Sequence, residues 1–487
     1  MPRLRFPLVG SYTSRNINPN SFATKDQQFI NCIPEIVKNQ LTGKAKAFLH
    51  KRPGYEKGPA LTGVASAGTV GAIGASRSLG LAAGFINTGG ASTSVWDLAT
   101  SSKVGGDIAN TSDVLALTET TISGTDYLVG NFLDTGVIEQ WYFPAAGAWT
   151  QVTDSDFPTI VGAPAHMDGF VFNMTSTGRI YNSDLNSVSS YNPTNFITAD
   201  LSPDGGVTVA RHNNIIIGFG HRSTEFFENK GHATGSPLSR VGGFRLGAAV
   251  YGVSNHPTVL NAYDTVYWIA TSHDAAVLGL YRFNGMSPEK ISSGHVDRLL
   301  ASGALNGIIG TLSLHGLNHV CLQGSAGVFC YCIETGIWWE LVLASGEPVA
   351  MTAASVATPS AATSYFIGSN NARSNEIPPS SPVYQDDGAA YTMTVQTDNI
   401  DADTDRVKFW KKLRVIADRQ SSGAVGVAWA DDDFTSYTTA TNVDITSDQS
   451  WLTRLGSSRR RSWKFTHSAN TPCRIEAVEI YYELGSS

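Results

Sequence analysis

Histidine and cysteine side chains gather between residues 315 and 332, and both residue types bind zinc in proteins. His315 and His319 are four positions apart, and Cys321, Cys330 and Cys332 follow. The segment has the pattern of a β-hairpin, in which His319 and Cys321 share one strand face, as do Cys330 and Cys332. Because the paired Cys-x-x-Cys spacing of a zinc site is missing, we predict no metal site here.

Carboxylates are frequent in the predicted turns, and a pair of them could hydrolyse a glycosidic bond. None stands in a distinctive motif, and acidic residues are common in the turns of any β-rich fold. Residues 431–434, DDDF, loosely resemble a sialidase-type aspartate box but lack its Gly and Trp positions. A glycan-binding or glycan-hydrolysing protein is therefore kept as an alternative to a structural one. The candidate carboxylates are Asp154, Asp156, Asp168, Asp264 and Asp274.

Two glycine-rich stretches could hold a nucleotide, but neither has the residues that this task needs. Residues 71–80, GAIGASRSLG, have no Walker lysine, and residues 218–220, GFG, lack the third glycine of a dinucleotide fingerprint. The chain also has no Gly-x-Ser-x-Gly elbow and no His-Glu-x-x-His motif. We therefore predict no cofactor, no catalytic residue and no enzymatic activity.

Basic and aromatic residues are mixed in two C-terminal stretches, residues 406–419 and residues 459–464, RRRSWK. Such a mixture can contact phosphates and bases, but Arg and Trp are also favoured in protein interfaces. We prefer the second interpretation, because an acidic body disfavours a general nucleic-acid binder. Together with basic residues near the N-terminus, the predicted interface candidates are Arg3, Arg5, Lys51, Arg52, Arg459, Arg460 and Arg461.

Charge is unevenly distributed along the 487 residues. Residues 1–60 carry a net charge of +7, residues 61–390 carry −13 and residues 391–487 carry −1. A basic N-terminal arm therefore precedes an acidic body. The arm is either simply solvated or docks on an acidic neighbour, such as another copy of the body.

The compartment is indicated by the cysteines and by the apolar runs. The five cysteines follow no disulfide framework, which fits free thiols in a reducing cytosol. Residues 1–10, MPRLRFPLVG, lack the apolar centre of a signal peptide, and no run approaches the roughly 18 apolar residues of a membrane span. We expect synthesis in the cytoplasm.

The clearest strand–turn–strand pattern is IIIGFGHRSTEFFENK at residues 215–230. β-Branched Ile215 and its neighbours favour extended backbone, while Gly218 and Gly220 permit a reversal or a close backbone approach. A second strand with Phe226 and Phe227 follows the polar turn. Similar units recur about every 40–55 residues, which is typical of β-propeller blades. The sequence predicts an all-β protein with a six- or seven-bladed propeller, and one or two β-sandwiches are the alternative.

Three regions are predicted along the chain. Residues 1–60 are expected to form an extended basic arm, because prolines recur there. Residues 61–390 are expected to form the propeller body, with a short helix near residues 294–301. Residues 391–487 return to strand patterns after a Pro-rich linker and predict an antiparallel β domain or closing strands. The first or last blade can be completed by strands from both chain ends.

Four stretches, in this order, resemble the tail hub or nozzle proteins of short-tailed bacteriophages, also called packaged-DNA stabilisation proteins. They are residues 31–54, with NCIPE and LHKRPG; residues 222–229, RSTEFFEN; residues 264–285, with DTVYWI and VLGLYRFNG; and residues 455–463, with LG and RRRSW. The structural markers of the resemblance are Arg222, Ser223, Thr224 and Glu225. We expect Glu225 to bind backbone donors or an arginine, Arg222 being close, at a blade corner.

The resemblance implies a structural virion protein in the phage tail, made in the bacterial cytoplasm. It implies a homohexameric ring below the portal and adaptor that extends the DNA-ejection channel and helps to retain packaged DNA. Implied partners are the adaptor and portal complex, a tail fibre or tailspike, a distal needle or plug protein, and duplex DNA in transient contact. An acidic wall would let DNA slide, since a basic one binds phosphates by counterion release.

Overall fold

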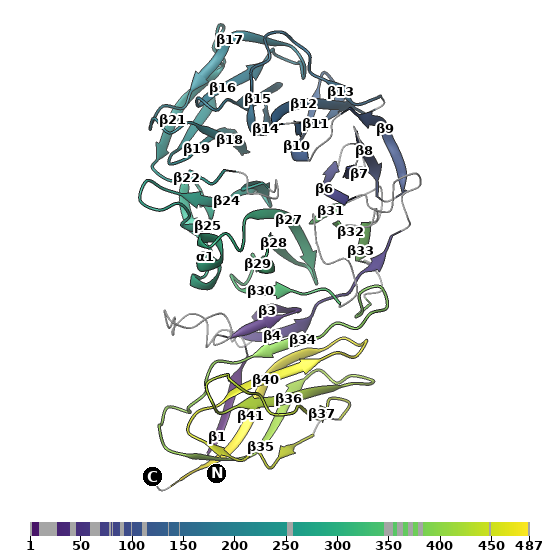
Figure 1. Ribbon diagram of the computed structural model, residues 1–487, viewed down its shortest axis with the longest axis vertical. Coiled ribbons are helices and arrows are strands. Elements are labelled where there is room, and N and C mark those ends of the chain that lie inside the picture. The colour runs from purple at the N-terminus through teal and green to yellow at the C-terminus, as the bar shows by residue number, and fades with distance from the viewer. Residues whose placement is uncertain are drawn as a thin grey trace.

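The computed structural model describes residues 2–8, 27–38, 45–58, 69–76, 79, 81–87, 92–98, 100–109, 114–134, 136–145, 147–250, 257–344, 354–357, 364–368, 374–377, 383–447 and 450–485. In this part of the chain α1 (Gly294–Ala301) is the single α-helix, and the other regular elements are strands. No helix here is long and apolar enough to cross a membrane. Figure 1 shows a ring of sheets at one end and a second β unit, with both chain ends, at the other.

The first sheets of the ring are each formed by four strands that follow one another in sequence. One contains β6 (Thr69–Ser76), β7 (Leu81–Asn87), β8 (Thr93–Asp97) and β9 (Ser102–Ile108). The next contains β10 (Val114–Ile122), β11 (Thr125–Asp134), β12 (Val137–Pro144) and β13 (Thr150–Gln151). Then come β14 (Val161–Met167), β15 (Phe170–Met174), β16 (Arg179–Ser183) and β17 (Tyr191–Thr198), followed by β18 (Gly206–His212), β19 (Ile215–Gly220), β20 (Thr224–Asn229) and β21 (Leu238–Phe244).

The remaining sheets close the ring. A five-stranded sheet contains β22 (Gly247–Ala248), β23 (Val259–Ala262), β24 (Thr265–Thr271), β25 (Gly279–Asn284) and β26 (Ser287–Lys290). The next group is β27 (Gly307–Leu314), β28 (Leu317–Gly324), β29 (Gly327–Cys332) and β30 (Trp338–Leu341). The last group combines β31 (Ala354–Ala357), β32 (Ser364–Gly368) and β33 (Ser374–Ile377) with β5 (Glu56–Lys57) from near the N-terminus.

Each strand group contacts its two neighbours through one of its strands, which we call its leading strand. These contacts form a closed cycle. The cycle runs β6, β10, β14, β18, β23, β27, β31 and back to β6. Because β5 pairs with β33, the last group is completed by a strand from the opposite end of the chain. Closure of this kind removes the exposed sheet edges. The predicted all-β fold with a β-propeller is confirmed.

The stretch that shows the repeat most clearly also shows how the sheets pack. β19 and β20 pair as the predicted hairpin, with Ile217 opposite Phe226 and Ile216 opposite Phe227. Ile217 and Phe226 are buried against Trp268 of the following sheet, whereas Ile216 and Phe227 are buried in a cluster with residues of the preceding sheet. Each sheet therefore buries both faces only between its neighbours, as a propeller requires.

The two glycines of β19 are required for close approach. A Cβ atom on Gly220 would lie 2.8 Å from the carboxylate of Asp204, and one on Gly218 would lie 2.9 Å from the side chain of Ile180. The predicted backbone approach is therefore present, and it occurs inside the strand rather than at a reversal.

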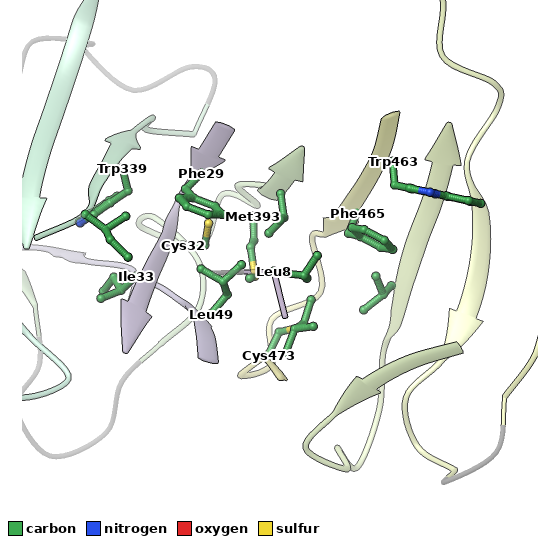
Figure 2. Packing of buried hydrophobic residues seen from close by; sticks show 14 of the residues in the cluster. Leu8, Phe29, Cys32, Ile33, Leu49, Trp339, Met393, Trp463, Phe465 and Cys473 are labelled. Atoms are coloured by element: carbon green, nitrogen blue, oxygen red, sulfur yellow. The ribbon is translucent and has the colours of Figure 1, made fainter. Parts of the chain in front are cut away.

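The second β unit is a sandwich of two sheets. The terminal sheet contains β1 (Arg3–Pro7), β3 (Cys32–Lys38), β4 (Ala45–Lys51), β35 (Lys408–Ala417), β38 (Leu452–Thr453), β39 (Ser457–Ser458) and β41 (Arg474–Leu484). The junction sheet contains β2 (Gln28–Ile30), β34 (Met393–Gln396), β36 (Ala424–Ala430), β37 (Thr441–Asp444) and β40 (Ser462–His467). Figure 2 shows the shared core, in which Leu49 lies near Leu8 and Met393.

The core of the sandwich continues into the propeller. Ile30 of β2 pairs in parallel with Glu340 of β30, which joins the junction sheet to a propeller sheet. Trp339 of β30 belongs to the same buried cluster as Phe29 of β2 and Ile33 of β3 (Figure 2). The two units are therefore fixed to each other by apolar packing as well as by backbone pairing.

The N-terminal strands lie inside the chain's own sheets. β1 pairs along its whole length with β41, and the side chains of Phe6 and Leu8 are 3% and 1% exposed in the core. For the described residues of 1–60, this differs from the expected extended basic arm, because burial of these side chains outweighs the solvation of the basic ones between them. The boundaries at residues 60 and 390 stay a prediction. The predicted helix is present as α1, with Ser293 as N-cap and with Val296 and Leu300 buried.

Candidate functional site

The described chain offers one conspicuous cluster of buried charge, at the junction between propeller and sandwich. The guanidinium of Arg52 donates to both carboxylate oxygens of Asp386 (2.9 and 2.6 Å), to the side-chain oxygen of Asn31 (2.9 Å) and to the carbonyl of Val342 (3.1 Å). Its centre lies 3.8 Å from the ring centroid of Tyr391. Burial opposes the charged form of Arg52, but Asp386 outweighs it and raises the pKa of this group.

Lys51 lies beside this pair and is equally enclosed. Its ammonium donates to the carbonyls of Ala469 (2.7 Å) and Tyr384 (3.3 Å) and lies 4.5 Å from the ring centroid of Tyr391. Burial lowers the pKa of Lys51 to about 8. Lys51 and Arg52 thus bind partners within the chain, and we assign them the task of holding the two β units together.

The basic triplet separates into one buried and two exposed residues. Arg461 is 1% exposed, and its guanidinium donates to both carboxylate oxygens of Asp431 at 2.6 and 2.7 Å. The indole rings around it belong to Trp410, Trp429 and Trp463, at 5.5, 5.0 and 5.1 Å. A guanidinium enclosed in this way stabilises the sandwich core and is not available to a neighbour or to DNA.

The other members of the triplet remain interface candidates. Arg459 and Arg460 are exposed and lie 3.4 Å from the carboxylates of Asp405 and Asp433, as loose surface ion pairs, and Arg459 also donates to the carbonyl of Asp405 at 3.0 Å. Arg3 and Arg5 are also half exposed, on β1. The structure therefore brings Lys51 and Arg52 together at the junction and Arg3 and Arg5 together on the terminal sheet, and keeps the triplet apart from both.

The marker residues form a corner of the β18–β21 sheet, as the sequence suggests. Glu225 accepts a hydrogen bond from the backbone N–H of Leu201 (2.7 Å) and pairs with Arg240 (2.6 Å), so its arginine partner is Arg240 and not Arg222. Burial raises the pKa of Glu225. Thr224 donates to the carbonyl of Leu246 (2.6 Å) at the start of the following sheet.

Arg222 and Ser223 bind a different carboxylate at this corner. The backbone N–H of Arg222 and the hydroxyl of Ser223 both donate to Asp204, at 2.5 and 3.1 Å, while the Arg222 side chain lies 3.1 Å from the imidazole of His273. All four markers thus fix loops between consecutive sheets. These contacts are internal to the propeller, and the role of the four residues as structural markers stays a prediction.

The histidine and cysteine candidates occupy a hairpin, as their spacing predicts. Cys321 faces Cys330 on β28 and β29, with the sulfurs 3.0 Å apart, and His319 faces Cys332. Burial lowers the pKa of His319 to about 4. His315 lies in the preceding turn, with its ring 5.3 Å from that of His50. Among the described residues, no group of three or more His, Cys, Asp or Glu side chains could hold a metal ion.

The acidic candidates lie in turns, and Asp154 and Asp156 share one of them. Asp154 accepts backbone N–H groups of Asp156 and Tyr191, at 2.9 and 3.0 Å, and Asp168 accepts the side-chain amide of Asn229 at 2.9 Å. These bonds order loops between strands, a common task of aspartate. They give Asp154 and Asp168 a structural task that needs no catalytic pair of carboxylates.

Sequence reasoning missed the acidic partners that define the junction and the sandwich. Asp386 and Glu479 are fully buried and each binds arginine, but neither stands in a recognisable motif. Their arginine partners, Arg52 and Arg414, are distant in sequence, so no neighbouring basic residue could have indicated these ion pairs. A useful signal was the Lys51-Arg52 pair itself, since two adjacent cations directly after an apolar strand require partners if that strand is buried.

The closed ring of antiparallel sheets defines the chain as a β-propeller protein. It belongs to the family described as bacteriophage P22 Gp10, β-propeller, whose sequence model matches residues 27–308, more than half of the chain. The predicted family is therefore confirmed. The chain is a phage tail stabilisation protein, and this membership indicates a structural component of a multi-protein virion assembly.

Solved structures show more distant similarity, and no curated protein matches this chain. The computationally designed Ika8 protein has 12% identity and a TM-score of 0.35, over 66% of this chain and 99% of its own. Raptor from Chaetomium thermophilum has 11% identity and a TM-score of 0.41, over 68% of this chain and 30% of its own. A chain of a mitotic checkpoint complex has 9% identity and a TM-score of 0.36, over 67% of this chain and 92% of its own.

Proposed function

We propose that six copies of this chain form a nozzle ring below the portal and adaptor and extend the channel through which DNA leaves the capsid. The observation that carries this proposal is the family match over the propeller, together with a second β unit rigidly joined to it. A ring needs a subunit with two different faces that meet head to tail and close. A propeller and a sandwich in fixed orientation supply such a subunit.

The cycle of leading strands supports seven blades rather than six. Its members are β6, β10, β14, β18, β23, β27 and β31, and each belongs to a separate strand group. In the last group, β5 supplies the closing strand. The last blade combines β31–β33 with β5 from near the N-terminus. The propeller therefore resists opening, because β5 and β33 must separate before the ring can unwind.

The DNA channel is proposed to lie between subunits and not through a single propeller. The leading strands, which surround the centre of the ring, contain Glu119 and Arg211 as their only Asp, Glu, Lys or Arg residues. The acidic excess of residues 61–390, −13, is therefore carried elsewhere, in the turns and in the other strands of the sheets. Such surfaces, when they line a channel made by six copies, repel phosphates and let duplex DNA slide.

The proposed partners are the adaptor and portal complex above the ring, and a tail fibre or tailspike and a needle or plug protein around and below it. Closure of the distal end by such a plug would retain the packaged DNA. Glycan hydrolysis is not proposed, because the family match favours a structural role.

Electron microscopy of the purified chain, alone and with the portal complex, tests the proposal. We expect six-fold rings with an axial channel that bind the portal complex end-on. Persistent monomers without affinity for portal-complex components would contradict it. Assembled tails in which another tail protein forms the ring below the portal and adaptor would contradict it as well.

A further inference from the structure

The outward side of the terminal sheet holds more positive than negative groups. Two carboxylates on this side are each shared by two cations. The pairs are Arg3 and Arg414 with Glu479 (2.8 and 2.7 Å) and Arg5 and Lys46 with Glu476 (2.8 and 3.1 Å). Burial opposes the charge of Glu479, but the hydrogen bond from Arg414 outweighs it and lowers its pKa, so four cations here face two carboxylates.

A fifth cation on this side lies over aromatic rings instead of beside a described carboxylate. The ammonium of Lys412 is 4.1 Å from the ring centroid of Trp451 and 4.6 Å from that of Tyr481, and Arg414 is 5.1 Å from Trp451. The two rings meet edge to face at 5.6 Å. Trp, Tyr and Arg are the residues that most often dominate the energy of protein interfaces. We call this group of cations and rings the terminal face.

A hollow of about 280 Å³ adjoins the terminal face. Its lining includes Arg5, Arg414 and Arg419, together with Asp444 and Ser450. Three guanidinium groups around one hollow favour an acidic side chain or loop as its occupant. The terminal face therefore combines aromatic anchors with an adjacent recess that selects negative charge.

The position of this face means that its partner comes from another molecule. In Figure 1, β1, β35 and β41 lie at the end of the molecule away from the propeller. Over the whole sequence, residues 1–60 carry +7 and residues 61–390 carry −13. Strands β1 to β4 lie in the sandwich, so the cations of the terminal face and the acidic propeller belong to different units of one chain.

We propose that the terminal face docks on the acidic propeller of a second copy of this chain, as the head-to-tail contact of the proposed ring. The inference rests on the proposed function and names the surface that it requires. The exposed carboxylates in propeller turns that could meet the face include Asp156, Asp168, Asp200, Asp264 and Asp274. A contact between different patches is heterologous, so its repetition gives a ring, and not a pair, when the rotation between successive copies closes.

Duplex DNA is the less favoured partner of the terminal face. Four of its five cations already share two carboxylates, and those carboxylates would repel a phosphate backbone. A second acidic propeller, by contrast, is present at equal stoichiometry and offers defined loops to the hollow and to the rings.

Charge reversal at Lys412 tests the proposal with the full-length chain. Lys412→Glu reverses this charge while leaving Arg3 and Arg414, the direct ion-pair partners of Glu479, in place, and we expect it to weaken self-association about tenfold in sedimentation velocity. Trp451→Ala removes the aromatic anchor without a charge change, and a similar loss is expected. Lys230→Glu is the matched control: it makes the same charge change on an exposed propeller lysine paired with Glu228, and association should stay equal or tighten.

Three outcomes decide the question. Loss of association in both terminal-face variants, with rings retained by Lys230→Glu, supports the proposal. Rings that form equally well in wild type, Lys412→Glu and Trp451→Ala overturn the docking surface while leaving the nozzle function intact. Failure of the wild type to form rings, alone or with the portal complex, overturns the proposed function itself. In a parallel anisotropy assay with a labelled DNA duplex, binding that Lys412→Glu abolishes while rings persist would assign the face to DNA.

Discussion

The propeller and the sandwich both pair strands and bury the faces of their sheets. They differ in how far apart in the sequence the paired strands lie. In the propeller, strands pair with their immediate sequence neighbours, as β18 to β21 do. In the sandwich, β1 pairs with β41, β2 pairs with β34 and β4 pairs with β41, so that partners come from opposite ends of the sequence. The propeller is built mainly from local hairpins and has one long-range closure, β5 with β33, whereas the sandwich adds several pairings between the chain ends to its local hairpins, such as β3 with β4.

This difference extends to charge. In the propeller, carboxylates such as Asp154 and Asp168 lie in turns, where they accept N–H groups from other loops and strands of the propeller. At the junction, Arg52 and Lys51 are buried and bind partners 334 and 418 positions away in sequence. Strands that meet from far apart need a means of fixing their register, and buried ionic networks are one such means. We therefore expect the stability of the sandwich to depend on long-range contacts more strongly than the stability of the propeller does.

The largest effect is expected at the junction. Asp386→Ala leaves Arg52 buried without its carboxylate, and we expect a loss of about 3–5 kcal/mol in the free energy of unfolding. Chemical denaturation followed by tryptophan fluorescence measures it. The matched control is Asp387→Ala, which removes the neighbouring carboxylate from a part-exposed pair with Lys57 (2.5 Å) and should cost about 0–1 kcal/mol.

A double variant separates charge from packing at the junction. Arg52→Met combined with Asp386→Ala removes both members of the pair, so the uncompensated charge disappears. The double variant should be more stable than Asp386→Ala alone. Equal costs for Asp386→Ala and Asp387→Ala would mean that the buried pair contributes no more than a surface one.

A somewhat smaller effect, about 3 kcal/mol, is expected when one large core residue is removed from either unit. Phe6→Ala creates a cavity beneath β1 and should raise amide hydrogen exchange in β41 and β35, more than 400 positions away in sequence. Phe219→Ala should raise exchange only in β18–β25, because its cavity lies between consecutive sheets.

The two patterns of exchange compare the units directly. Exchange that rises in β18–β21 after Phe6→Ala, or in β41 after Phe219→Ala, would show that the units unfold together and that the contrast between them is wrong. Deletion of residues 1–30 is also expected to disturb the sandwich itself, since β1 supplies part of its core. Assembly defects in such a deletion need the exchange data as a control.

The local character of the propeller explains why much of it could be predicted from sequence. The hairpin at residues 215–230 is recognisable because β-branched residues, glycines and a polar turn act within a few positions of one another. The pairing of β1 with β41 has no such local signal, so the N-terminal residues look like an arm. Glu225 shows the same limit on a smaller scale, since its corner role was predicted but its partner, Arg240, lies across the sheet.

The triplet at residues 459–461 shows why basic residues could not be sorted from sequence. Arg461 forms an isolated bridge with Ile400 just before β40 and enters a cage of indoles, whereas Arg460 lies in the preceding bend and stays exposed. Which of these side chains is buried depends on contacts with strands that are distant in the chain. Composition therefore identifies candidate interface residues, and only the assembled core separates them.

The smallest predicted effect concerns Lys51, whose pKa is lowered to about 8 from its ordinary value of 10.5, chiefly by burial. Between these values the unfolded chain holds a proton that the folded chain has released, so stability from this group rises with pH. Relative to Lys51→Met, the wild type should therefore gain about 1 kcal/mol between pH 8 and 9.5 and show no difference in slope below pH 7. Denaturant titrations of both proteins at each pH measure this, and the comparison cancels the common contribution of tyrosines that ionise on unfolding. A wild-type curve that falls relative to Lys51→Met over this range would mean that Lys51 is held more firmly protonated when folded, and that the junction stabilises its charge instead of merely tolerating it.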